Sequence, residues 1–564
     1  MDQNLQTELG VLQDDESPGR KRWLHLLLLA ALVLQLVWMV NAFPHWREPN
    51  SASRVYLAVA IAQHGTFQID KCLTSYGDTL DKARFKDHFY TDKAPGTSFL
   101  FVPATWLISA ISPADPANPK GPGLIDMQFL FLALRILCVS LPTIVFWWYT
   151  LPWFRTWTGR EDRAVAVVAA GALGTNFCIY ATQLFAHVPA AWFLFLAFLS
   201  VRRCWTSANL KKPYDPGLWG GALAGVAFLN DYVVMLAVGL LGISTFLARS
   251  DWRQTFAFGV GLAPSLIIWM GYNWICFDHP LKTGFVYHAS PIYGNLYHSG
   301  FLGMQNIDKT SVLGMLLSPA RGMCFVSPIL ALAPIGWWRQ FRSTTFRADA
   351  LCAAAIVASM FFFAMTTIDW RGGWGIGTRY LVATVPFLMV GIAGAVRELK
   401  ASDPLSIVFG GLAVVGVVLA ALASVTVPFF PQDFDNPFFT LAWPLLREGY
   451  LAPHLGTNIA GPVFGLLPYV VGVLVTVTLV ATSGPARGIA DKIVAVSLSL
   501  ALAVVVIAWQ SRMPEPPRDK LARDVARAEV IGRLGYLDVA VRELSELKDN
   551  DAPAPSPPAV PSTR

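Results

Sequence analysis

Residues 44–98 read PHWREPNSASRVYLAVAIAQHGTFQIDKCLTSYGDTLDKARFKDHFYTDKAPGTS, a polar stretch in a chain that is otherwise largely apolar. The stretch follows an apolar run from Trp23 to Phe43 and carries many acids, bases and histidines. A short connecting loop between two membrane helices needs few such residues. We therefore interpret residues 44–98 as the catalytic loop of a membrane enzyme, and the rest of the chain as the frame that holds it against the bilayer.

The composition places the chain in a membrane. Of its 564 residues, 54% are hydrophobic and only 14% are charged, whereas a soluble protein usually carries about 25% charged residues. Many apolar runs approach the roughly 20 residues that cross a bilayer, which predicts an all-α polytopic integral membrane protein with about 13 transmembrane helices. The net charge of +6 lies mostly in short loops. The expected partners therefore include membrane lipids and exclude nucleic acid.

The positions of the positive charges predict the orientation of the chain. Arg20, Lys21 and Arg22 precede the first apolar run, which puts the N-terminus in the cytoplasm and the large first loop outside. We expect a multi-pass protein of the inner (cytoplasmic) membrane whose active site faces the periplasm or exterior. We expect a cytoplasmic N-terminal tail over residues 1–22 and a catalytic membrane core over residues 23–400. Additional C-terminal transmembrane helices follow over residues 401–511, and residues 512–564 form a helical and then disordered tail.

Several segments carry specific structural expectations. Residues 51–65 predict a short amphipathic helix that ends at Gly65, and the charged residues 78–88 predict an exposed turn and helix. Residues 97–112 are apolar but short, and the charges of the neighbouring loops favour a re-entrant or juxtamembrane segment on the outer side. Continuous membrane spans are expected, among other places, over residues 164–181 and 312–338.

Three outside loops combine aromatic residues, glycines and cations in an unusual way. Arginine and lysine bind phosphate groups, tryptophan and tyrosine offer a flat face to a sugar, and glycine lets the backbone approach a ligand closely. The combination suits a lipid phosphate that carries a sugar. The three clusters are YTDKAPG (90–96), GFVYHASPIYGNLYH (284–298) and DWRGGWGIGTRY (369–380).

At these residues the chain resembles a known family. TDKAPG resembles the Asp/Glu-Lys-Pro-Pro signature of GT-C glycosyltransferases, in the glycosyltransferase family 39 group. That group includes protein O-mannosyltransferases and the lipid A aminoarabinose transferase. The resemblance extends from the first apolar helix to the end of the predicted core, and four further segments support it in the same order: REPNSASRVYLAVAIAQHGTFQID, ATQLFAHVPAAW, SPARGMCFVSP and GGWGIGTRYLVATVPFL.

The resemblance implies a GT-C-like bundle and inverting transfer of a sugar from a polyprenyl-phosphate donor to a lipid, glycan or protein acceptor. Such a transfer needs a carboxylate base for the acceptor and positive charge for the departing phosphate. The base position matches Glu48, although the chain has Arg47-Glu48 where relatives carry an acidic pair, and Asp70 is the reserve. The candidates for the donor phosphate are Arg54, Lys93 and Arg379.

The resemblance also implies a divalent metal as a possible cofactor. Asp92 matches the motif acid, which in some relatives binds a metal together with a histidine, and His288, His298 and His187 are the possible partners. The spacing does not choose among them, and we take Asp92 with His288 as the expected pair. Asp231 lies between two short apolar segments, where it is either a functional intramembrane acid or a turn residue. The expected substrate-binding residues are His187, Tyr287, His288, Trp370 and Trp374.

Two other kinds of function compete with the enzyme. A transporter or flippase of lipid-linked sugars predicts charges near the membrane midplane and an internal repeat, whereas the charge here is concentrated in loops and the sequence shows no repeat. A non-catalytic assembly protein of the cell envelope stays open because of the departure at Arg47-Glu48. The sequence does not specify the sugar or the acceptor.

Overall fold

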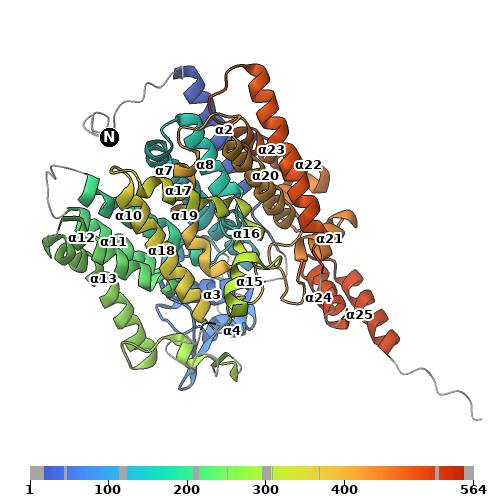
Figure 1. The fold of residues 1–564 in the computed structure, drawn as a ribbon. Coiled ribbons are helices and arrows are strands. Elements are labelled where there is room, and N and C mark those ends of the chain that lie inside the picture. Colours follow the sequence, from blue (N-terminus) through green and yellow to red (C-terminus); the bar gives the residue numbers. More distant parts are fainter. Residues whose placement is uncertain are drawn as a thin grey trace, which may run out of the picture.

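The computed structural model describes residues 18–43, 47–112, 123–206, 215–249, 252–291, 293–294, 307, 309–367, 369–514 and 520–551. Within these ranges the chain is a bundle of helices with one short hairpin (Figure 1), which confirms the all-α polytopic fold class. Eight described helices are long and apolar enough to cross a membrane: Met127–Thr158, His187–Thr206, Trp252–Phe277, Arg347–Thr366, Arg379–Val396, Pro404–Val425, Leu455–Ala481 and Ile489–Ser511. The count of thirteen crossings stays a prediction.

The helices pack through small residues and a few internal hydrogen bonds, as membrane helices commonly do. Helix α11 (Asp215–Asn230) lies on α13 (Trp252–Phe277) and α10 (His187–Thr206) at one side of the bundle, and α20 (Pro404–Val425), α22 (Leu455–Ala481) and α23 (Ile489–Ser511) form the other side (Figure 1). The first helix, α2 (Pro18–Leu36), joins this second group. There the Gln35 side chain donates to the carbonyl of Gly472 at 3.0 Å.

The 44–98 loop folds as short elements at one end of the bundle. Helix α3 (Pro49–His64) ends at Gly65, whose φ of 61° is the left-handed conformation of a helix C-cap, so the predicted boundary is confirmed. Most of α3 is buried against α5 (Gly96–Ile111) instead of lying at an interface. At 16 residues, α5 is about 24 Å long, shorter than the roughly 30 Å hydrocarbon core. The following residues, 113–122, lie outside the described ranges.

The predicted charged helix over residues 78–88 is wrong. After α4 (Asp70–Tyr76), strands β1 (Ala83–Phe85) and β2 (His88–Tyr90) form an antiparallel hairpin in which Arg84 pairs with Phe89. The strands contain Phe85, Phe89 and Tyr90, and aromatic residues favour a pleated, half-buried strand. The hairpin turn places Lys86 at φ 54°.

Two of the expected continuous spans are broken. The first divides at Gly174 into α8 (Glu161–Leu173) and α9 (Asn176–Tyr180). The second divides around Arg321 because Pro319 and Gly322 interrupt the helix, and Pro328 opens a further short segment. Its pieces are α15 (Lys309–Leu317), α16 (Met323–Val326), η4 (Pro328–Leu332) and α17 (Ala333–Phe341).

The C-terminal tail packs at the same end of the molecule as the 369–380 loop. Helices α24 (Lys520–Arg533) and α25 (Leu537–Asp551) form a hairpin in which the Arg533 guanidinium lies 4.1 Å from the centre of the Trp374 ring. Disorder was expected over residues 550–564, but α25 continues to Asp551, and residues 552–564 lie outside the described ranges. The remaining elements are α6 (Met127–Leu134), η1 (Arg135–Ser140), α7 (Leu141–Thr158), η2 (Tyr232–Val234), α12 (Met235–Arg249), η3 (Gly284–Tyr287), α18 (Arg347–Thr366), η5 (Arg379–Thr384), α19 (Val385–Val396), η6 (Phe438–Ala442) and α21 (Trp443–Arg447).

Packing of α17 against α19 generates a testable prediction. A Cβ atom on Gly336 would lie 1.5 Å from the carbonyl oxygen of Gly391, so Gly336→Ala must push the helices apart. Overpacking of this kind costs about 1–3 kcal/mol, which outweighs the gain of about 1 kcal/mol in helix propensity. Thermal unfolding in detergent should show a clearly lower midpoint for Gly336→Ala. The control is Gly239→Ala in α12, where nothing lies within 4 Å; equal midpoints for the two variants would contradict the close contact.

Candidate active site

Glu48 is the N-cap residue of α3, directly before its first residue Pro49. Its two carboxylate oxygens accept hydrogen bonds from the backbone N–H groups of Asn50 at 2.9 Å and Ser51 at 2.8 Å. The Ser51 hydroxyl donates a third bond at 2.9 Å. The side chain therefore caps α3 and is held in one orientation. Burial raises the pKa of Glu48, the nearby Asp81 carboxylate acts in the same direction, and the three hydrogen bonds oppose them.

Arg54 lies six residues beyond Glu48 on the same helix, which is more than one and a half turns, and it is 5% exposed. One of its terminal nitrogens donates to the backbone carbonyl of Asn50 at 2.8 Å and also contacts the Asn50 side chain. Its Nε atom is buried and has no hydrogen-bond partner among the described residues. The guanidinium interacts electrostatically with Asp231, Asp92 and Glu48. It is therefore a buried cation with one donor left for a ligand.

Arg379 begins η5 at the end of the 369–380 loop. Its guanidinium lies over the rings of Phe185 and Tyr380, at 5.7 and 5.4 Å from their centres. The Nε atom is buried and lacks a hydrogen-bond partner within the described part of the chain. Gly372 lets it approach, because a Cβ there would lie 2.7 Å from this Nε atom, and its φ of 70° also favours glycine. Arg379 interacts electrostatically with Asp81, His187 and Glu48.

Lys93 joins two carboxylates. Its Nζ atom lies 2.8 Å from an oxygen of Asp81 and 2.7 Å from an oxygen of Asp92. Burial alone would raise the pKa of Asp81, but the ion pair with Lys93 outweighs it and lowers that pKa. The Asp92 oxygen that contacts Lys93 also lies 3.7 Å from the Nε2 atom of His288. Burial lowers the pKa of His288, and the Asp92 charge opposes this.

The group Asp81, Asp92 and His288 has the side chains of a metal centre. One ligand atom from each residue lies within 4.8 Å of the others. Two carboxylates and an imidazole suit a divalent transition metal, so the donor set fits the expected cofactor. The expected pair was Asp92 with His288, and the structure adds Asp81 as a third donor. The Lys93 ammonium already balances the two carboxylates, so a bound ion would share them with this lysine.

His187 and Asp231 form a buried pair. The Nδ1 atom of His187, at the start of α10, lies 2.5 Å from an Asp231 carboxylate oxygen, and the side chains are 7% and 13% exposed. The other Asp231 oxygen accepts from the backbone N–H of Val233 at 3.3 Å, which caps η2. The pairing resolves the alternative for Asp231: it caps a turn and also holds a histidine.

The structure thus brings residues from distant segments into one charged cluster. Arg54 and Arg379 both interact with Glu48, and between them they also reach Asp81, Asp92, His187 and Asp231. We call this group, together with Lys93 and His288, the charged cluster. It draws on α3, the segments on either side of the β1–β2 hairpin, the starts of α10, η2 and η5, and the residue after η3.

Four predicted residues have other contacts. Asp70 accepts from the backbone N–H of Phe89 at 3.1 Å and lies 3.4 Å from His88, which ties α4 to β2. The Tyr287 ring stacks on Phe277 at 5.2 Å. The Trp374 ring lies under Arg533 of the tail. The Trp370 ring packs over Gly314, where a Cβ would lie 2.2 Å from it. His298 lies outside the described residues.

Arg321 is a functional candidate that the sequence did not single out. It is 2% exposed and its terminal nitrogens donate to the backbone carbonyls of Gly373 at 3.1 Å, Phe430 at 3.0 Å and Gly375. It therefore fixes the 369–380 loop that positions Arg379. The signal in the sequence is the position of a charged residue between Pro319 and Gly322 inside an apolar run.

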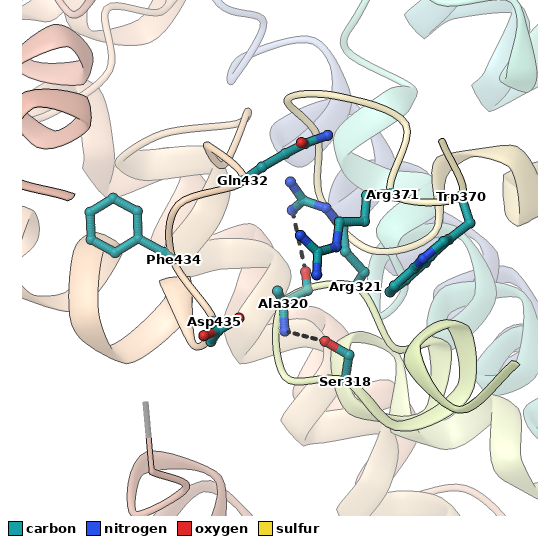
Figure 2. A pocket seen from close by; sticks show the side chains of 8 residues that line it. All are labelled: Ser318, Ala320, Arg321, Trp370, Arg371, Gln432, Phe434 and Asp435. Carbon is teal, nitrogen blue, oxygen red and sulfur yellow. Dashed lines mark hydrogen bonds between the residues drawn. The ribbon is translucent and has the colours of Figure 1, made fainter. Parts of the chain in front are cut away.

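A small pocket lies on the other side of this loop (Figure 2). The guanidinium groups of Arg321 and Arg371 border it, with Trp370 beside them, and the Phe434 ring points away (Figure 2). Arg371 lies 5.5 Å from the centre of the Trp370 ring. The pocket is thus separate from the charged cluster but shares the Arg321 support. Its residues are Ser318, Ala320, Arg321, Trp370, Arg371, Gln432, Phe434 and Asp435.

The support that Arg321 gives to the loop can be tested by hydrogen exchange. Arg321→Met keeps the length of the side chain and removes the donors to four carbonyls, three of them in the loops named above and the fourth that of Ala320. The amides of Gly375 and Ile376, which bond to Phe430 O and Tyr180 Oη at 3.1 and 3.0 Å, should exchange at least about tenfold faster, a loss of about 1.4 kcal/mol of protection. The control is Arg342→Met, whose guanidinium stacks on Trp338. Unchanged exchange in the loop of Arg321→Met would show that other contacts hold it.

Comparison with known proteins gives distant structural similarity only. No family model matches the chain, and no curated protein matches it. The chain is similar to ArnT from Cupriavidus metallidurans in the apo state, at 14% identity and a TM-score of 0.46 over 82% of this chain and 78% of that one. For ArnT from the same organism bound to undecaprenyl phosphate, the identity is 14% and the TM-score 0.44, over 81% of this chain and 77% of that one. For the apo oligosaccharyltransferase from Archaeoglobus fulgidus, the identity is 11% and the TM-score 0.39, over 97% of this chain and 62% of that one.

The expected family, the GT-C glycosyltransferases, therefore rests on the sequence motifs quoted above. With TM-scores below 0.5, the structural matches do not themselves assign a reaction, which has to follow from the residues of the charged cluster.

Proposed function

We propose that the chain is a membrane glycosyltransferase that moves a sugar from a polyprenyl-phosphate donor to a lipid, glycan or protein acceptor at the outer face of the cytoplasmic membrane. One observation carries the proposal: Arg54 and Arg379 both lie in the charged cluster, and each keeps a buried Nε atom without a partner among the described residues. Arg135, Arg163 and Arg321 share this feature but lie outside the charged cluster. A buried donor without a partner costs about 1–3 kcal/mol. An anionic ligand that binds between the two arginines removes this cost, and both lie in the charged cluster.

A lipid phosphate suits these cations better than a carboxylate substrate. Phosphate accepts several charge-assisted hydrogen bonds at once, and arginine matches its geometry. Lys93 adds a third positive charge from its position between Asp81 and Asp92. Positive charge that is already in place stabilises the phosphate as it leaves the sugar, when its negative charge grows. Arg54, Arg379 and Lys93 are therefore assigned to the donor phosphate.

Glu48 is assigned to the acceptor. Attack of the acceptor on the anomeric carbon, with inversion there, requires that the nucleophile lose a proton. The carboxylate of Glu48 is fixed by Asn50 and Ser51 and has lone pairs left to take that proton. Its raised pKa brings it closer to the working pH than an ordinary carboxylic acid, which improves a general base.

A divalent metal would be held by Asp81, Asp92 and His288. When bound, such an ion supplies further positive charge beside the leaving phosphate. Because Lys93 pairs with the same two carboxylates, its ammonium supplies charge at that place from the chain itself.

Two assays test the proposed reaction. Mass spectrometry of lipids and glycans from a strain that lacks the protein should show an accumulated polyprenyl-phosphate sugar and a lost modification, which identify the donor and the acceptor. Purified protein in lipid nanodiscs should then transfer the sugar. Movement of the intact donor between leaflets without transfer would support a flippase, and neither activity would support an assembly protein.

The cations generate the first prediction about activity. Arg54→Gln and Arg379→Gln should weaken binding of the donor and lower turnover, because a phosphate contact that strengthens in the transition state contributes to both. We expect kcat/KM to fall by about 10²-fold or more for each, as charge-assisted contacts are worth about 1.5–3 kcal/mol. The control is Arg342→Gln, which is remote from the cluster. Wild-type kinetics in both cluster variants would reject the shared phosphate site.

Glu48 generates a prediction about pH. The base works only when deprotonated, so turnover should fall as pH decreases through the pKa of Glu48. Because burial raises that pKa, the acidic limb should lie at higher pH than for an ordinary carboxylic acid. Glu48→Gln should lower kcat by about 10²-fold or more and abolish this limb, while donor binding survives. The base would have to be another group if the variant kept the limb and normal kcat.

A further inference from the structure

The pair of His187 and Asp231 is the part of the charged cluster that has no role in the transfer as described so far. Its two residues are 44 positions apart in the chain, and their side chains meet at 2.5 Å. The contact uses Nδ1 of the histidine. The opposite ring nitrogen, Nε2, forms no hydrogen bond within the described ranges, while 7% of the side chain remains exposed.

The surroundings of His187 identify which substrate group it faces. Tyr380 packs against the ring with its edge, at 6.0 Å between ring centres, and Tyr180 does the same at 6.1 Å. The Tyr180 hydroxyl is engaged with the carbonyl of Ile376 at 3.1 Å. The charged groups that act on His187 are Asp231, Arg379 and Arg54. Arg379 and Arg54 are the two arginines assigned above to the donor phosphate, so His187 lies near the place assigned to that phosphate.

We infer that His187, held by Asp231, is the general acid that donates a proton to the lipid phosphate as it leaves the sugar. The inference rests on the proposed function and adds a second catalytic residue to it. Asp231 acts through His187 and is a positioning residue. It accepts the Nδ1 proton, which leaves Nε2 as the nitrogen that faces the substrate, and it stabilises the imidazolium form.

The step balances. The acceptor oxygen forms a bond to the anomeric carbon, and the bond from that carbon to the phosphate oxygen breaks with its electron pair. The acceptor proton passes to Glu48, and the Nε2 proton of His187 passes to the phosphate oxygen. One proton is taken up and one is given, so exchange with solvent restores both residues.

Electrostatics supports an acid at this position once the donor is present. Without the donor, burial is the largest effect and disfavours a positive charge on His187, Asp231 favours that charge, and Arg379 and Arg54 oppose it. A bound phosphate adds negative charge between the arginines and shifts the balance towards imidazolium. The donor therefore generates the acid form that its own departure requires.

The dependence of kcat on pH tests the inference. With Glu48 as base and His187 as acid, the wild-type profile should be bell-shaped, and its alkaline limb should report the histidine. His187→Gln should lower kcat by about 10²-fold or more and remove the alkaline limb, with donor binding within a few-fold of wild type. Asp231→Asn should keep the limb but move it to lower pH, because the imidazolium loses its counter-charge.

The control is His25→Gln. His25 also pairs with a carboxylate, that of Glu161 at 2.8 Å, but it lies in α2. The dependence of kcat on pH for His25→Gln should therefore match that of the wild type. An alkaline limb that persists in His187→Gln would overturn the inference. Loss of donor binding in that variant with unchanged kcat would also overturn it, in favour of a binding role. If His187→Gln does not fold, the Asp231→Asn variant decides: an alkaline limb at the same pH as in wild type would contradict the inference.

The proposed function is judged separately in the same experiment. A wild-type protein that transfers no sugar refutes the proposed function itself. A wild-type protein that transfers sugar, together with a His187→Gln variant of normal kcat and unchanged profile, refutes only the acid.

Discussion

The Lys93 ammonium, placed between the carboxylates of Asp81 and Asp92, is the contact on which the charged end of the molecule depends. Two buried carboxylates repel each other and are costly to keep ionised. The lysine compensates both at 2.7–2.8 Å. The contact also has a structural effect, because it joins the residues before the β1–β2 hairpin to those that lead into α5. A chain that buries so many ionisable groups needs such pairing before it can present free cations to a ligand.

Arg321 performs the corresponding task for the 369–380 loop. Its guanidinium replaces the regular backbone hydrogen bonds that this glycine-rich segment lacks, and it satisfies carbonyls from two separate loops. The close approach of Arg379 to Gly372 is possible only while that segment keeps its course. The proposed phosphate site therefore depends on two structural cations: Lys93, which pairs with Asp81 and Asp92, and Arg321, which holds the loop before Arg379.

The sequence predicts the general fold and the chemical type of the site, because both depend on composition and local pattern. Apolar runs indicated helices and Gly65 indicated the end of α3, and the structure confirms both. Positive charges predict which loops lie outside, and that orientation stays a prediction. Glu48, Arg54, Lys93 and Arg379 were singled out from loops on one side. The roles assigned to them remain predictions.

What the sequence does not predict depends on contacts between distant residues. The pairing of His187 with Asp231 spans 44 positions and leaves no local pattern. Asp81 is one acid among many in a stretch that was expected to be helical, and only the hairpin brings it to Lys93. Arg321 lies inside an apparently continuous apolar run, which hid the break in the helix. Trp374 was expected to face a sugar, but a tail helix from the far end of the chain covers its ring with Arg533.

The central claim is that Arg54 and Arg379 form one binding site for a lipid phosphate. An experimental structure of the full chain in nanodiscs with added polyprenyl phosphate tests it most directly. The account predicts phosphate density within hydrogen-bond distance of the Nε atoms of both arginines, with the lipid chain leaving towards the bilayer. Phosphate density at Arg371 in the pocket of Figure 2, or elsewhere on the molecule, with the two Nε atoms still unpartnered, would contradict it.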